Sequence, residues 1–104
     1  MEIKGSYIGK DTKIQGTLSF SGDIRIDGHV DGALSGGTTG RILISEKGYF
    51  EGKAEAERIE IRGVFRGDAK VDGFFVYAPG VAKGCIQSSS IFVEDGAKIF
   101  NSGD

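Results

Sequence analysis

One short pattern, apolar–x–Gly–x–apolar, recurs along this chain and limits what it can fold into. It reads VDGAL at 30–34 and FRGDA at 65–69, and its central glycines occupy positions 16, 32, 52, 67 and 84. A nearly fixed period of about 16–17 residues is typical of a repeat architecture, in which each repeat is one structural unit. The longest step, between positions 32 and 52, contains SGGTTG at 35–40, which we interpret as an excursion of a few extra residues.

A second element, two apolar residues separated by one position, lies between successive copies of the first. These pairs are Ile24/Ile26, Ile42/Ile44, Ile59/Ile61, Phe74/Val76 and Ile91/Val93. Apolar residues at period two predict strands with one buried face, and no segment has a helical period. A single repeat cannot bury its own apolar side, whereas stacked repeats can. The sequence therefore predicts an all-β parallel β-helix of roughly six coils, about 30 Å long at ~4.8 Å per strand.

Glycine-rich bends are expected between the short strands of each coil. The chain contains 18 glycines and 1 proline among 104 residues, which is more than twice the usual share of glycine. We expect the first coil to start at Tyr7 or Ile8. The predicted organisation is a short tail at 1–6, one β-helical domain at 7–100 and a second short tail at 101–104.

The stretch IDGHVDG at 26–32 resembles a chemical site, because it holds the only histidine between two carboxylates. The apolar residues around Asp27 and His29 are expected to face the core, which leaves both polar side chains at a solvent-exposed corner. Zinc sites need three or four ligands, and the spacing from Asp27 to Asp31 does not match a calcium-binding loop. We interpret the stretch as a bend and expect neither a metal nor catalysis there.

Composition and charge exclude several classes of function. The 13 basic and 15 acidic residues are interspersed and give a net charge of −2, which argues against nucleic acid as the partner. A single cysteine, Cys85, cannot form an internal disulfide and fits a reducing compartment. No apolar run approaches ~18 residues, so we expect no transmembrane segment. Residues 1–6 also make a poor membrane anchor, so we expect a cytoplasmic protein. No glycine-rich loop opens a helix to bind a nucleotide, and we expect no cofactor.

The main enzymatic alternative is a left-handed β-helix acyltransferase. Those enzymes repeat a regular hexapeptide, three per coil, and use a histidine base at a trimer interface. The spacings of this chain break the hexapeptide rule. An acyltransferase would form a stable trimer and lose turnover when His29 is replaced.

One outward column of side chains is unusually apolar. The middle residue of each apolar pair should face solvent, and these residues are Arg25, Leu43, Glu60, Phe75 and Phe92. Exposed Leu43, Phe75 and Phe92 would form a lateral or partner-binding face. The alternative is a local shift of register that turns Phe75 into the core in place of Phe74.

The two ends of the predicted rod carry the strongest functional signal. The last coil, IFVEDGAKIF at 91–100, is apolar, and only a few residues precede Tyr7 and Ile8 at the other end. Solenoids need polar caps, because the terminal coils otherwise expose unpaired strand edges and an open core. Neither end has room for a capping helix, so we expect the rods to associate end to end.

Three segments carry a resemblance to a known family: YIGKDTKIQGTLSFSGDIRIDGHVDG, ILISEKGYFEGKAEAERIEIRG and IFVEDGAKIF. Over roughly 7–100 the chain resembles the bactofilins, a family of bacterial cytoskeletal proteins. The resemblance implies a right-handed β-helix with a triangular core. It also implies polymerisation without nucleotide into non-polar filaments, through head-to-head and tail-to-tail contacts.

The resemblance further implies a scaffold for cell shape or for cell-wall enzymes, often at the inner face of the membrane. In this resemblance the closing AKIF puts Ile99 and Phe100 at the C-terminal polymer contact, with Phe92 beside them. We expect Tyr7 and Ile8 to belong to the polymer contact at the opposite end. We therefore expect a non-enzymatic, self-assembling structural protein. The alternative is a discrete β-helical module that binds a partner through its apolar lateral face.

Overall fold

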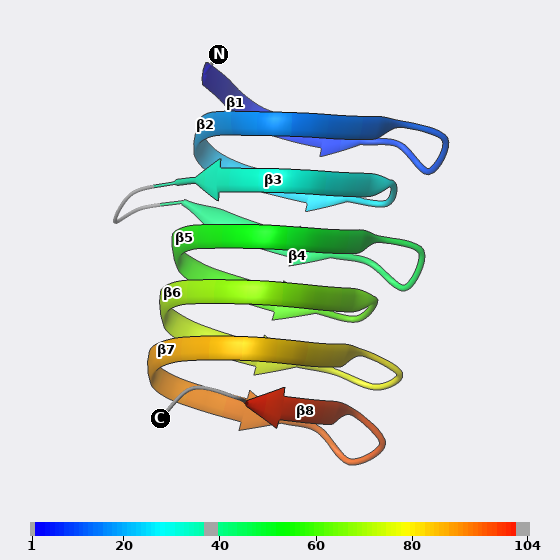
Figure 1. Ribbon diagram of the computed structural model, residues 1–104, viewed down its shortest axis with the longest axis vertical. Coiled ribbons are helices and arrows are strands. Elements are labelled where there is room, and N and C mark those ends of the chain that lie inside the picture. Colours follow the sequence, from blue (N-terminus) through cyan, green and yellow to red (C-terminus); the bar gives the residue numbers. More distant parts are fainter. Residues whose placement is uncertain (1, 37–39, 102–104) are drawn as a thin grey trace.

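Parallel β-strands form the whole regular structure of the computed structural model, which describes residues 2–36 and 40–101 (Figure 1). The strands are β1 (Glu2–Ile8), β2 (Lys13–Ile26), β3 (His29–Ser35), β4 (Arg41–Ile44), β5 (Tyr49–Ile61), β6 (Val64–Val76), β7 (Val81–Val93) and β8 (Lys98–Asn101). They hydrogen-bond in the order β1-β2-β3-β5-β6-β7-β8, and β4 pairs with β2 and β5. The chain is therefore a β-solenoid of about 5 turns, which confirms the predicted fold class.

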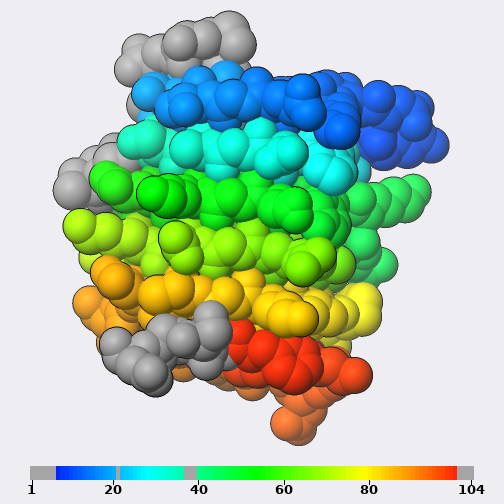
Figure 2. Space-filling view, in the orientation of Figure 1, coloured from blue at the N-terminus to red at the C-terminus, as the bar shows by residue number. Residues whose placement is uncertain are grey.

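The solenoid winds in a right-handed sense. In Figure 1 the front strands run from right to left and the rear strands return from left to right, while the chain descends from its N-terminus to its C-terminus. The turns lie on one another as parallel bands in Figure 2. The molecule measures 33 × 27 × 19 Å, and its long dimension agrees with the rod length expected from stacked strands.

The repeat glycines stand directly above one another, as the repeat predicts. The register pairs Gly16, Gly32, Gly52, Gly67 and Gly84 in one column. At Gly67 the backbone φ is +131°, a conformation that side-chain-bearing residues rarely adopt. A Cβ atom there would overlap the carbonyl oxygen of Gly52 in the turn before. Close approach of successive turns and a positive φ therefore both require glycine in this column.

The apolar pairs form the core, and they also stand in columns. Ile26, Ile44, Ile61 and Val76 are successive members of one column and are each 0 % exposed. Phe74 is likewise 0 % exposed, whereas its neighbour Phe75 points outward and is half-buried. The alternation predicted for this pair is therefore confirmed, and no shift of register turns Phe75 inward.

Three phenylalanines from neighbouring strands fill the middle of the core. Phe50 and Phe65 stack with ring centroids 5.2 Å apart, and Phe74 meets Phe65 edge-on at 6.1 Å. Both offset stacking and edge-to-face contact are favourable ring geometries. Large aromatic side chains from different sides of a turn thus meet at the axis of the rod.

Each turn divides into three short segments around this core. The buried side chains of β5 are Phe50, Ala54, Ala56, Ile59 and Ile61. The run of buried residues is interrupted at Gly52 and again at Glu57 and Arg58, which divides it into three groups along the strand.

Two details differ from the expected boundaries. β1 begins at Glu2, not near Tyr7 or Ile8. The backbone of β1 pairs with β2 as far back as Glu2, which lies opposite Ser19. This start could not be read from the sequence, because no apolar pattern marks a strand there. The tail expected at 1–6 therefore contains most of the first strand. The wider step in the repeat falls where β3 ends at Ser35 and β4 begins at Arg41. Part of the predicted excursion, 37–39, lies outside the described residues.

Candidate assembly surfaces

The C-terminal end of the rod leaves its apolar core partly uncovered. β8 pairs only with Val81–Gly84 of β7, so the rest of β7 has no strand beyond it in the described chain. Ile91 continues the column of Ile59 and Phe74, which are both 0 % exposed, yet Ile91 itself is 48 % exposed. An open strand edge beside exposed core side chains is a template for a further strand.

The residues predicted for this contact take two different positions. Ile99 continues the inward column above Ala82 and packs against the core, half-buried. Phe92 and Phe100 both point outward and are 48 % and 54 % exposed. The structure thus brings Ile99 and Ile91 to the end of the core and places Phe92 and Phe100 at the rim, on different sides of the last turn. Strand alternation, which turns Ile99 inward and the next residue outward, is the signal that could have separated them.

At the N-terminal end, the two predicted contact residues also differ. Ile8 belongs to the core and is only 4 % exposed, so it offers little surface to another chain. Tyr7 points outward and is 62 % exposed. Of this pair, Tyr7 is the residue that a partner could reach.

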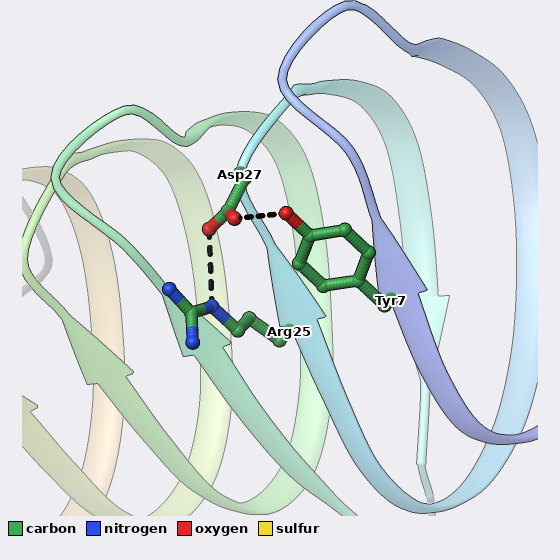
Figure 3. A network of polar contacts seen from close by, with 3 residues as sticks. All are labelled: Tyr7, Arg25 and Asp27. Atoms are coloured by element: carbon green, nitrogen blue, oxygen red, sulfur yellow. Dashed lines mark hydrogen bonds and ion pairs between the residues drawn. The ribbon is translucent and has the colours of Figure 1, made fainter.

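Tyr7 takes part in a polar network that ties the first turn to the second (Figure 3). Its hydroxyl donates a hydrogen bond to Oδ2 of Asp27 at 2.5 Å, and Nε of Arg25 donates to Oδ1 at 3.2 Å. Asp27 is only 8 % exposed, so the expectation that it faces solvent at the corner was wrong. Its carboxylate tolerates burial because it has hydrogen-bond partners. Hydrogen bonds from Ser45 and Tyr7, together with Arg25, hold the pKa of Asp27 below its ordinary value.

We expect Asp27→Asn to lower the stability of the fold by roughly 1–2 kcal/mol at neutral pH, since it removes a charged hydrogen-bond acceptor. The pKa of Asp27 is lower in the folded chain than in the unfolded one, so its contribution is present above a pH of about 4 and disappears as the pH falls through the folded value. Thermal melts followed by circular dichroism should show the wild type and the variant converging toward pH 2.

The control for this prediction is Asp23→Asn, which removes an exposed carboxylate from β2, just before the bend that holds Asp27. An exposed surface charge contributes little to stability, so this change should leave the melting temperature nearly unaltered. Equal losses in both variants would contradict a specific role for the Asp27 network.

The outward column predicted to be apolar is interrupted in its middle. Its members in register are Tyr7, Arg25, Leu43, Glu60, Phe75 and Phe92. Glu60 separates Leu43 from Phe75, so the three apolar residues do not form one continuous face. Phe75 and Phe92 instead join Tyr77 in a cluster of rings, with centroids 5.8 to 6.5 Å apart.

The bend at 26–32, which resembled a chemical site in the sequence, does not bring together side chains suited to catalysis or metal binding in the described chain. The His29 ring packs against the ring of Tyr49, with centroids 4.6 Å apart, and Cys85 is a half-buried free thiol. Within 2–36 and 40–101, no group of three or more His, Cys, Asp or Glu side chains could hold a metal ion. The same residues form no helix that is long and apolar enough to cross a membrane. The described surface does offer exposed apolar side chains, at the C-terminal end and on the side of the rod.

Comparison with known proteins adds one finding to this geometry. The family model described as "Bactofilin: Polymer-forming cytoskeletal" matches residues 6–102, which is nearly the whole chain. No curated protein and no solved structure gives a significant match. The matched range includes Tyr7 as well as the last turn of the solenoid.

Proposed function

Because this chain belongs to the bactofilin family of polymer-forming cytoskeletal proteins, we propose that it is a non-enzymatic scaffold whose copies join through the ends of the rod. The observation that carries the proposal is the exposure of Ile91. This residue occupies a core column but lacks a covering turn in the described chain. A second copy placed on this end would bury Ile91 as the following turn, which contains Ile91, buries Phe74.

The contact at the C-terminal end is a symmetric one in this proposal. Two copies that meet end to end would bury Ile91 and Ile99 at the centre, with Phe92 and Phe100 at the rim. A two-fold contact uses every residue twice. Burying one large apolar side chain is worth ~1.5–3 kcal/mol, so the junction needs no nucleotide to form. Tyr7, with Ile8 beneath it, would mark the contact at the opposite end, which gives a filament without polarity.

Membership of a cytoskeletal family supports a place in the cytoplasm and a role in cell shape or in positioning cell-wall enzymes. In this proposal the partner of each copy is first another copy. The outward ring cluster around Phe75 supports a second possibility, a discrete module that binds another protein without polymerising. The two functions differ in particle mass: a scaffold elutes as a polymer without added nucleotide, and a module elutes as a monomer or small oligomer.

We expect Ile91→Lys to abolish filaments while the solenoid remains folded. A lysine at the centre of the junction would bury its charge without a partner, and the symmetric contact would contain two such charges. Phe100→Arg, at the rim, should weaken the junction by several kcal/mol, since it removes an apolar side chain twice per contact. Negative-stain electron microscopy and size-exclusion chromatography without nucleotide would measure both effects.

The matched control is Val64→Lys, which places the same charge on a half-buried aliphatic position in the middle of the rod. This variant should form filaments like the wild type. Circular dichroism would establish that all variants retain their β-structure. If Ile91→Lys still forms filaments, the C-terminal end is not the junction. If the wild type elutes as a monomer, the module is the better function.

A further inference from the structure

One side of the rod combines arginines with aromatic rings, and these side chains are exposed or half-buried. We name it the arginine–aromatic face, and its residues are Arg41, Arg58, Arg62, Phe75, Tyr77 and Phe92. The rings of Phe75, Tyr77 and Phe92 contact one another at centroid distances of 6.5, 6.3 and 5.8 Å, and Phe92 is 48 % exposed. Contiguous apolar patches rimmed by polar residues are typical of interaction sites.

Two of the arginines lie over these rings. The guanidinium carbon of Arg58 is 4.3 Å from the centroid of the Phe75 ring, and that of Arg62 is 5.4 Å from the Tyr77 ring. A cation over the face of an aromatic ring is attracted by the electrons of that face. The rings therefore hold two positive charges on this side of the rod, and a guanidinium can also donate two hydrogen bonds to a carboxylate.

The hydrogen-bonding capacity of Arg58 is only partly used. Its Nη2 lies 3.3 Å from Oε1 of Glu60, in an ion pair whose side chains are 42 % and 34 % exposed. Its Nε is buried and has no hydrogen-bond partner among the described residues. A buried donor without an acceptor destabilises the protein. The exposed part of the Arg58 side chain lies at its terminal nitrogens, and these are the atoms that a bound carboxylate would reach.

Like charges also stand next to each other on this face. Arg41 and Arg58 occupy neighbouring strands in direct register, with Asp23 on the far side of Arg41 and Gly73 beyond Arg58. Like charges directly opposite each other are unfavourable in a sheet. Such a pair favours an added negative charge between the two guanidinium groups.

We propose that the arginine–aromatic face docks an acidic segment of a partner protein that also carries aromatic or large apolar side chains. Carboxylates would meet the edges of Arg41 and Arg58, and the apolar side chains would pack on the Phe75 and Tyr77 rings. Glu60 lies within the face and Glu94 borders Tyr77. These carboxylates oppose a continuous polyanion such as nucleic acid or an anionic bilayer, whereas a peptide with spaced acidic residues avoids them.

The test uses biolayer interferometry on the full-length chain, with a random copolymer of glutamate and tyrosine as the probe. We expect Arg41→Glu to weaken binding of the copolymer about tenfold, because it reverses one charge of the pair. The matched control is Lys70→Glu, on another side of the rod. Lys70 lies in register with Glu55 and Gln87, so it has one acidic neighbour, as Arg41 has Asp23. The control should bind like the wild type.

Three results would overturn the proposal. They are no binding of the copolymer, equal weakening by both charge reversals, and binding of phosphatidylglycerol vesicles or of an oligonucleotide as tight as that of the copolymer. The arginine–aromatic face lies on the side of the rod, and neither substitution touches the ends. Filaments seen by electron microscopy should therefore be unaltered in both variants, so that this test and the assembly test can fail independently.

Discussion

Gly67→Ala is expected to destabilise the solenoid by about 3 kcal/mol or more, which is enough to unfold a marginal domain. The added methyl group would overlap the carbonyl oxygen of Gly52, which is backbone and cannot move aside as a side chain could. The φ of +131° adds strain of its own for any residue with a Cβ. Urea unfolding followed by circular dichroism would measure the loss.

The same column provides a control that separates the two causes. Gly16 also has a positive φ, of +112°, but a Cβ there would meet nothing within 4 Å. Gly16→Ala should therefore show the backbone strain alone, about 1–2 kcal/mol. If both variants lose the same stability, the close approach of successive turns is not what demands glycine.

Phe65→Ala should lower the free energy of unfolding by about 3–5 kcal/mol. The side chain is 0 % exposed and contacts Phe50 on one side and Phe74 on another, so its removal opens a cavity at the axis of the rod. The control is Phe92→Ala, which deletes the same side chain from the surface and should lose about 1 kcal/mol or less. Similar losses in both variants would mean that the ring stack at the axis does not stabilise the fold.

The sequence was sufficient for the register, because two independent patterns point to the same alignment. Glycine recurs where turns approach closely, and pairs such as Ile59/Ile61 recur at period two, so each predicted column also exists in the structure. Alternation within the pair favoured Phe74 inside and Phe75 outside, but it left a local shift of register open, and only the structure excludes that shift. The handedness of the solenoid could not be predicted from these patterns. Its right-handed sense was implied by the family resemblance and not by any spacing.

The polar and aromatic contacts could not be predicted, because they depend on side-chain directions across neighbouring turns. Asp27 was expected at the surface, and only its contacts with Tyr7 and Arg25 explain its burial. The stacking of Arg58 on Phe75 likewise joins residues whose closeness depends on how each side chain lies along the rod. At the C-terminal end the apolar residues were identified, but the separation of the core end from its rim required the pairing of β7 with β8.

Because equivalent residues stack in columns, this chain can gain or lose sequence one whole turn at a time. Deleting or duplicating one whole turn, such as residues 52–66, would leave every column continuous and both ends intact. Losing one residue within a strand would instead exchange its inward and outward faces. The stretch between Ser35 and Arg41 shows where additional residues are accepted, at a corner between two strands. A solenoid of this kind can therefore change its length by duplication while the residues at its two ends stay the same.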